Sequence, residues 1–196
     1  YEACRVFAPY VKYLGDNRWD FSETHTCPIP QEFKTLIEEY LHTVLTSDAP
    51  NKGWKIPETT LVYPWIVRLF PDIRYIHWVR DPRDCILGSH LTDDLGDFGI
   101  RYEKTDDIRT NRAISWLYQR EIMHATPMPE HVISVRFEDM VFHQDETLAR
   151  LEKFLGIPMA KIEMRTDSVG RYKTDDGVHM FPFFQAEMDE LGYAAE

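Results

Sequence analysis

An arginine-rich turn between two regular elements is the part of the sequence best suited to bind an anion. The motif Arg80-Asp81-Pro82-Arg83-Asp84 follows a β-forming run over residues 74–80, and Pro82 stands where a first helical turn accepts proline. Amide groups at a helix start and a guanidinium would then converge on one point, which suits a phosphate. The alternative is an ordinary strand-to-helix turn with a capping aspartate and surface arginines, and the residues alone do not separate the two.

The charge of the chain limits which ligands it attracts. Its 196 residues include 33 acidic and 22 basic ones, which gives a formal net charge of -11. This overall field repels nucleic acid and anionic membranes, so neither is an expected partner. A polyanionic ligand must therefore be held by a local basic cluster.

Length and cysteine content indicate one cytoplasmic domain. A chain of 196 residues with 43% hydrophobic content buries one sizeable core, so we expect a single domain over 1–196. Cys4, Cys27 and Cys85 form neither a disulfide framework nor a zinc pattern, which favours a reducing compartment and no metal. No stretch approaches the ~20 apolar residues that span a bilayer. The chain begins at Tyr1 inside an amphipathic pattern, so we expect the domain to be N-terminally incomplete.

Hydrophobic periodicity predicts an alternation of helices and strands. The expected helices are 31–47, 59–70, 85–95, 106–125, 145–156 and 182–191, and the expected strands are 53–56, 74–80 and 132–137. The last two strands lack a helical period and are expected to be buried, the 74–80 strand on both faces. This order predicts an α/β fold, a three-layer sandwich with a central parallel sheet covered by helices. Arg80, Glu138 and Asp139 would lie at the carboxyl ends of its strands, where ligands bind in such sheets.

Six segments resemble, in order, the sulfotransferase family. The first two correspond to the family's Lys-x-Pro strand and to its phosphate-binding strand, turn and helix. The next two correspond to its Tyr-Glu-Asp-Leu strand end and to the end of the helix that follows. The last two correspond to its C-terminal nucleotide loop and to the usual ending of bacterial members. The segments are Gly53-Trp54-Lys55-Ile56-Pro57-Glu58, residues 69–84, Val135-Arg136-Phe137-Glu138-Asp139-Met140, Phe154-Leu155-Gly156, Ser168-Val169-Gly170-Arg171-Tyr172 and Leu191-Gly192-Tyr193. The resemblance implies a fold like that of P-loop nucleoside triphosphate hydrolases, here without its first strand and phosphate loop.

The resemblance also implies a reaction and a set of site residues. A sulfuryl group would pass from 3′-phosphoadenosine 5′-phosphosulfate to a hydroxyl or amine, which leaves adenosine 3′,5′-bisphosphate, with no metal required. Lys55 would face the transferring sulfuryl group or the acceptor, where an ammonium offsets developing charge. The nucleotide would be bound by Arg80 at the 3′-phosphate, by Phe137 near the adenine, and by the closing loop with Gly170, Arg171 and Tyr172.

Three features depart from the family pattern. The family serine eight residues after the arginine is replaced by Gly88, and Ser89 follows one position later, about 100° further around a helix. Either the helix starts differently here, or Gly88 leaves room for the nucleotide and Ser89 binds the phosphate less directly. No Gly-rich or G-x-x-x-x-G-K-[ST] phosphate loop is present, and the economical explanation is that it precedes Tyr1. The catalytic base is also unassigned, because no histidine stands in the Lys-x-Pro segment; the candidates are Glu2, Glu23, His25, Glu58 or a residue upstream of Tyr1.

Two other functions remain open from the sequence. A kinase of the same sheet class would use Arg80 and Arg171 as a phosphate clamp, but it needs a magnesium site and a phosphate loop with lysine. A non-catalytic module would keep the fold and bind nucleotide or a partner. The acceptor, a small molecule or a glycan, is set by variable loops, and the oligomeric state has no sequence signal. Aromatic residues in expected loops hint at an apolar or ring-bearing acceptor: Trp19, Phe21, Phe98 and Tyr102.

Overall fold

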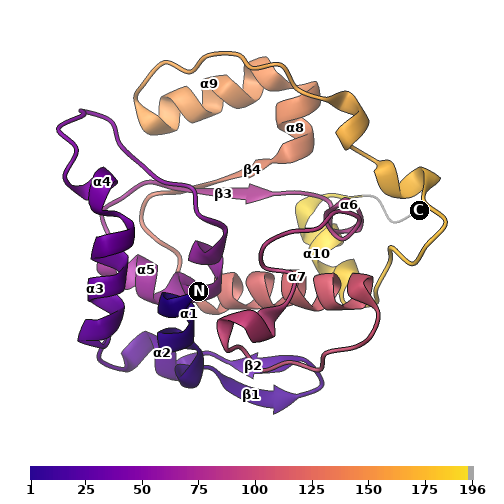
Figure 1. Ribbon diagram of the computed structural model, residues 1–196. Coiled ribbons are helices and arrows are strands. Elements are labelled where there is room, and N and C mark those ends of the chain that lie inside the picture. The colour runs from indigo at the N-terminus through magenta and orange to yellow at the C-terminus, as the bar shows by residue number, and fades with distance from the viewer. Residues whose placement is uncertain (194–196) are drawn as a thin grey trace. The chain divides into compact units, whose positions relative to one another are not determined.

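The structure, a computed structural model, describes residues 1–193 and divides into two compact units (Figure 1). Unit 1 comprises Tyr1–Leu69 and His90–Pro127, and unit 2 comprises Phe70–Ser89 and Met128–Glu196. Each unit therefore contains segments that are far apart in the sequence. The two units are described separately below.

Unit 1 is mainly helical and contains one antiparallel hairpin. Its hairpin joins β1 to β2 through Asp16 and Asn17, whose φ values of 52° and 49° are typical of a tight two-residue turn. The pairing places Tyr13 opposite Trp19. The elements are α1 (Glu2–Phe7), η1 (Ala8–Tyr10), β1 (Lys12–Gly15), β2 (Arg18–Asp20), α2 (Ser22–Thr26), α3 (Gln31–Tyr40), α4 (His42–Leu45), η2 (Pro57–Val62), α5 (Tyr63–Leu69), η3 (Leu95–Phe98) and α7 (Ile108–Ala125).

Aromatic residues form the core of unit 1. Trp65 on α5 lies edge-on to Phe7 and Phe33, with ring centroids 4.9 and 4.8 Å away. Tyr118 on α7 is fully buried and contacts Trp19 and Phe21. Trp19, Phe21 and Phe98 are thus core residues, which corrects the expectation that they lie in loops facing an acceptor; Tyr102 is half-buried and its hydroxyl donates to Asp94.

Unit 2 is built on a pair of parallel strands. β3 (Tyr75–Val79) pairs with β4 (Val132–Arg136), and the register places Trp78 beside Val135. Two helices, α8 (Phe137–Phe142) and α9 (Gln144–Leu155), lie on one side of these strands (Figure 1). The remaining elements are α6 (Pro82–Cys85), η4 (Thr166–Ser168), η5 (Arg171–Thr174) and α10 (Phe184–Leu191). The protein is therefore a mixed α/β protein with a small parallel sheet.

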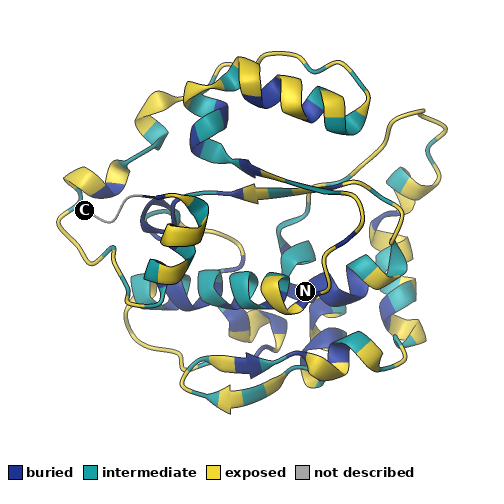
Figure 2. Ribbon diagram, turned by 180° about the vertical axis from the view of Figure 1, so that it is seen from behind, coloured by how far each residue is buried: buried dark blue, intermediate teal, exposed yellow. Residues whose placement is uncertain are grey.

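The core of unit 2 joins β4 to the helices that follow it. Val135 packs with Met140, Leu148 and Leu151, and buried residues alternate with exposed ones along α9 (Figure 2). The helix ends at Gly156, whose φ of 74° is the left-handed conformation that favours glycine at a helix end. The expected amphipathic helix over 145–156 is thereby confirmed.

Three expectations about the elements need correction. The strand over 74–80 forms, but Ile76 and Trp78 are 39% and 49% exposed, so it is not buried on both faces. Residues 53–56 are extended without a pairing strand among the described residues. The helix expected over 85–95 is absent, because α6 ends at Cys85.

Sheet size and helix length complete the comparison with expectation. The described residues form two sheets of two strands each, so the larger central sheet of a three-layer sandwich is not seen. Among residues 1–193, no helix has the length and apolar content needed to cross a membrane. Five other helices form within the expected ranges: α3 and α4 within 31–47, α5 within 59–70, α7 within 106–125 and α10 within 182–191.

Candidate functional site

The carboxyl end of β3 brings together the residues of the candidate anion site, all within unit 2. Arg80 follows the last residue of β3, and Asp81 then caps α6 by accepting a hydrogen bond from the Arg83 amide at 2.9 Å. Pro82 occupies the first turn of α6, as expected. The amide of Asp84 bonds the Asp81 carbonyl, so the first amides of this short helix are already paired. The helix start therefore offers no free amide, and Arg80 remains as the candidate anion-binding group.

The Arg80 guanidinium contacts two polar groups and one aromatic ring. Its Nη2 donates to the carbonyl of Ser168 and lies 3.7 Å from a carboxylate oxygen of Asp84. Its Cζ lies 4.6 Å from the ring centroid of Phe137, a cation–π distance. Its Nε is buried and has no hydrogen-bond acceptor among the described residues, although the side chain as a whole is 24% exposed. Buried donors are normally paired, and the Nε of Arg136 is the other buried side-chain nitrogen without an acceptor among the described residues.

Asp84 holds the loop over residues 168–174 against the end of β3. Its carboxylate is fully buried and accepts from the amides of Gly170 at 2.7 Å and Tyr172 at 3.1 Å. The guanidinium of Arg171 donates to the Asp84 carbonyl at 2.9 Å. Arg80 and Arg171 therefore both contact Asp84, Arg80 at its carboxylate and Arg171 at its backbone carbonyl. The Gly170 amide, expected to face the phosphate, is instead engaged by Asp84.

Arg83 has a different role from Arg80. Its guanidinium forms a paired contact with the Asp81 carboxylate, with Nη2 to Oδ2 at 2.7 Å and Nε to Oδ1 at 3.0 Å. The same guanidinium lies over the buried ring of Tyr172 at 4.0 Å. The contact between Arg83 and Tyr172 thus helps to hold the loop in place. The charge of Arg83 is already paired with Asp81 inside the protein.

Glu138 and Tyr193 connect the second strand end to the same turn. Glu138, near the start of α8, accepts from the Asp81 amide at 3.0 Å and from the Tyr193 hydroxyl at 2.8 Å. The Arg136 guanidinium lies 4.3 Å from the Tyr193 ring centroid. Burial, followed by the charge of Glu138, raises the pKa of the Tyr193 hydroxyl well above its ordinary value. The Leu-Gly-Tyr ending therefore serves to brace this site.

Gly88 and Ser89 lie beyond the end of α6 and not on a helix. Ser89 is exposed, and Gly88 is half-buried with no heavy atom within 4 Å of the position that a Cβ would occupy. The structure therefore leaves open space at the position where the family carries its serine.

Lys55 and the four candidate bases all belong to unit 1. Lys55 is exposed on the extended segment before η2. Glu2 and Glu58 line one apolar cavity. Glu23 is exposed on α2, and His25 on the same helix is half-buried, where burial and then the charge of Arg68 lower its pKa.

Residues 22–26 do not form a phosphate loop. They are the helix α2, and the carbonyl of Thr24 accepts from Trp65 at 3.1 Å and from Arg68 at 2.8 Å. This segment is therefore committed to the core of unit 1.

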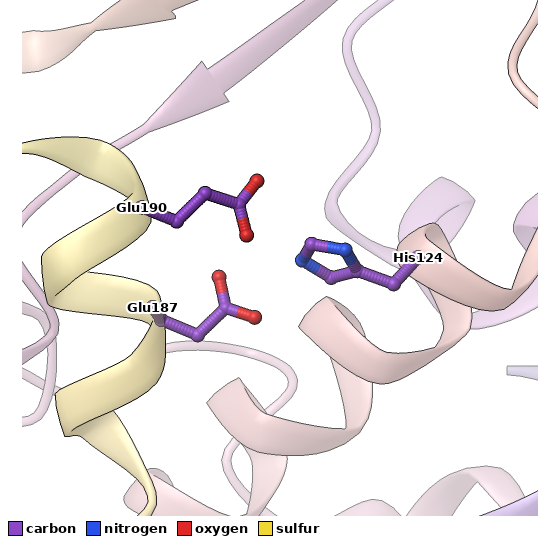
Figure 3. A group of neighbouring side chains, drawn as sticks. All are labelled: His124, Glu187 and Glu190. Carbon is purple, nitrogen blue, oxygen red and sulfur yellow. The ribbon is translucent and has the colours of Figure 1, made fainter.

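An acidic pair on α10 was not singled out from the sequence. Glu187 and Glu190 project from the same side of α10 one turn apart, and His124 in the last turn of α7 belongs to the other unit (Figure 3). Acidic pairs are common on helix surfaces without any bound ion, so this pair by itself defines no site.

The structure brings together Arg80, Phe137 and the loop with Arg171, which the sequence had singled out, but the sequence did not indicate the contacts of Asp84. The sequence clue to Asp84 is its position four residues after Arg80, a spacing at which an acid and a base can form a salt bridge. That spacing did not reveal the contact with a loop 86 residues further along the chain.

Comparison with known proteins bears on the family. A family model described as the sulfotransferase family matches residues 1–161, which include the Lys55 segment, Arg80 and Phe137 but not the loop over 168–174. Neither a curated protein nor a solved structure matches the chain. The family match covers far more than half of the sequence and agrees with the ordered segments identified from the residues. This chain belongs to the sulfotransferase family.

Proposed function

We propose that the chain transfers a sulfuryl group from 3′-phosphoadenosine 5′-phosphosulfate to a hydroxyl or amine of a small-molecule or glycan acceptor. Family membership supports sulfotransferase activity in general. The observation that supports this donor is the Arg80 guanidinium, whose buried Nε has no acceptor among residues 1–193. A 3′-phosphate would provide that acceptor through a charge-assisted hydrogen bond.

The surroundings of Arg80 fit the 3′-phosphoadenosine end of this donor. Arg171 provides a second guanidinium, bonded to the same residue that Arg80 contacts. Phe137 provides an aromatic ring next to Arg80, on which an adenine can pack. With a net charge of -11, these local arginines must supply the attraction that the overall field does not.

Other residues of the loop and turn would act around this core. Gly170 would shape the loop through its left-handed backbone, with φ of 74°, and Tyr172 would support it from its buried position. Gly88 and Ser89 would border the nucleotide beyond α6 and contribute little binding energy. When bound, the donor supplies an activated sulfuryl group whose leaving group is adenosine 3′,5′-bisphosphate. Lys55 would face the transferring group and offset the charge that develops there.

We also propose that β3 and β4 belong to the central parallel sheet of the three-layer fold that the resemblance implies. The exposed apolar side chains of Ile76 and Trp78 support this extension. Apolar residues on both faces are typical of strands in a covered parallel sheet.

The test of the donor is calorimetric titration with adenosine 3′,5′-bisphosphate, adenosine 5′-phosphate, and ATP with magnesium. Each charge-assisted contact is worth about 1.5–3 kcal/mol, so Arg80→Ala should weaken binding of the bisphosphate by roughly 10- to 150-fold. Adenosine 5′-phosphate, which lacks the 3′ group, should lose far less. Arg74→Ala, at an exposed arginine just before β3, is the matched control and should change neither affinity.

Two results would contradict the donor assignment. Equal losses for the two adenosine nucleotides in Arg80→Ala would show that Arg80 does not read the 3′-phosphate. Tighter binding of ATP with magnesium than of the bisphosphate would favour a kinase instead.

A further inference from the structure

The end of α10 fixes the position of Tyr193 within unit 2. Gly192 follows the helix with φ of 71°, the left-handed conformation that favours glycine at a helix end. The Tyr193 amide then donates to the carbonyl of Met188 at 2.8 Å, which closes the last turn. Tyr193 is buried, so its ring is directed into the unit and not toward solvent.

The ring of Tyr193 packs on the guanidinium of Arg136, the last residue of β4. The Cζ of Arg136 lies 4.3 Å from the ring centroid, a cation–π distance. Within residues 1–193 the buried Nε of Arg136 has no acceptor, so the aromatic face is a main contact of this guanidinium. A side chain at position 192 would lie close to the same group, because Nη1 is 3.6 Å from the position of a Cβ. Arg136 therefore helps to set the plane of the Tyr193 ring and the direction of its hydroxyl.

One carboxylate connects the Tyr193 hydroxyl to the turn that carries Arg80. Glu138, in the first turn of α8, accepts from this hydroxyl at Oε2 and from the Asp81 amide at Oε1. That amide belongs to the peptide bond between Arg80 and Asp81. Glu138, Asp81 and Tyr193 are all buried, so water competes little for these hydrogen bonds. With one donor on each oxygen, the carboxylate has little freedom to rotate away from the peptide beside Arg80.

We propose that Tyr193 is a positioning residue for Arg80, because its hydroxyl, through Glu138, fixes the peptide from which the Arg80 side chain projects toward the 3′-phosphate. This inference rests on the proposed function, since it assigns a determinant of affinity to the same nucleotide site. Tyr193 acts through Glu138 and does not itself contact the nucleotide. Arg136 supports it from the other face of the ring. The affinity for the 3′-phosphate therefore depends on the residue that follows α10 and Gly192.

The binding test compares two tyrosines of unit 2 that each lose only a hydroxyl. Tyr193→Phe keeps the ring over Arg136, and the matched control is Tyr75→Phe, at the buried first residue of β3, whose hydroxyl donates to the Phe70 carbonyl at 2.8 Å. Both variants lose one hydrogen bond of a buried tyrosine, so Tm should fall by similar amounts. In calorimetric titrations of the whole chain, only Tyr193→Phe should weaken binding of adenosine 3′,5′-bisphosphate, by about 3- to 10-fold. Its affinity for adenosine 5′-phosphate should stay within about twofold of the parent value.

A second variant tests the connection through Glu138. Glutamine has only one acceptor oxygen at its end, so Glu138→Gln can serve only one of the two donors, and bisphosphate binding should weaken by about 3- to 10-fold. Adding Tyr193→Phe to this variant should cost less than about twofold more, because both changes break the same connection. Additive losses in the double variant, or equal losses of bisphosphate affinity in Tyr193→Phe and Tyr75→Phe, would overturn the proposal.

NMR of the isotope-labelled chain without nucleotide separates this inference from the donor assignment. The Asp81 amide should exchange with solvent at least about threefold faster in Tyr193→Phe than in Tyr75→Phe, and the Arg80 Nε resonance should shift only in Tyr193→Phe. If these signals change as expected while the parent chain binds neither adenosine nucleotide, the donor assignment fails and the positioning role of Tyr193 stands. If the parent chain binds the bisphosphate while the Asp81 amide exchanges equally in both variants, the positioning role alone is refuted.

Discussion

Replacement of Asp84 by asparagine tests how the loop over residues 168–174 is held. The Asp84 carboxylate is fully buried and accepts hydrogen bonds from the amides of Gly170 and Tyr172. Asparagine has nearly the same shape, but only one of its two terminal atoms accepts a hydrogen bond. Its NH₂ group would therefore face a backbone N–H that has lost its acceptor.

The expected loss of stability follows from these two contacts. A hydrogen bond to a charged group contributes about 1.5–3 kcal/mol, and an unsatisfied buried donor costs about 1–3 kcal/mol. We therefore expect Asp84→Asn to lower the free energy of unfolding by about 3–5 kcal/mol, the usual cost of breaking a buried ionic group. In a chain of this length, each kcal/mol lowers Tm by about 2–4 °C, which predicts a fall of about 6–20 °C.

The assay combines thermal unfolding by circular dichroism with hydrogen exchange at the loop amides. Asp72→Asn, at an exposed acid in the same unit, is the matched control and should change stability by no more than about 0.5 kcal/mol. The variant Asp84→Asn should also bind adenosine 3′,5′-bisphosphate more weakly, because the loop carrying Arg171 is released. The reasoning is refuted if Tm stays within about 2 °C of the parent and the Gly170 and Tyr172 amides keep their protection.

Three further predictions concern other residues of the chain. Lys55→Ala should lower turnover by ~10²-fold or more with Tm nearly unchanged, since Lys55 is exposed; unchanged turnover, as expected for the control Lys12→Ala, would remove it from the site. Gly88→Ser should strengthen bisphosphate binding by about 2- to 10-fold through one added hydrogen bond, because a Cβ there meets nothing within 4 Å. Gly53→Ser, at an equally open glycine in unit 1, is the control, and the same gain in that variant would contradict a local effect. Burial raises the pKa of the Cys4 and Cys85 thiols to about 12, so at pH 8 only about one in 10⁴ of these thiols is thiolate. Iodoacetamide should therefore label half-exposed Cys27 first. Early labelling of Cys4, measured by mass spectrometry, would contradict its burial.

The sequence predicted the elements whose hydrophobic pattern is regular and local. The expected helices over 106–125 and 145–156 form because one apolar stripe faces the core and each has a clear boundary, Asp107 as N-cap of the first and Gly156 after the second. The parallel pair β3–β4 was also predictable, since both strands are short β-forming runs separated by helices. Family membership followed from the order of the segments and is confirmed over residues 1–161.

The helix expected over 85–95 failed because local side-chain contacts favour turns there. The amide of His90 donates to the Asp93 carboxylate at 2.8 Å, the ring of His90 bonds the Thr92 hydroxyl, and Asp94 accepts from the Gly96 amide. Such side-chain hydrogen bonds compete with the helical backbone. The apolar spacing of this segment resembled a helix, but spacing does not reveal that competition.

The candidate site was predictable residue by residue but not as an assembly. The motif Arg80-Asp81-Pro82-Arg83-Asp84 carries two arginines and two aspartates, and the sequence does not say which acid pairs with which base. That choice depends on the loop over 168–174, which meets the motif only in the folded unit. The base candidates likewise required the fold, since only the structure places Glu58 against a cavity.

The pairing within this motif explains why Arg80, and not Arg83, is the arginine left for a ligand. Arg83 gives its Nε and one Nη to the Asp81 carboxylate, and this bidentate pair is buried on both sides. The Asp84 carboxylate oxygens accept hydrogen bonds from two backbone amides. Nη2 of Arg80 lies 3.7 Å from the Asp84 carboxylate, which is longer than a hydrogen bond. Arg80 therefore keeps an unpaired Nε on a side chain that is partly open to solvent. A dianionic phosphate gains more from a guanidinium in this state than from one whose donors are already used, so the two neighbouring arginines divide between binding and support.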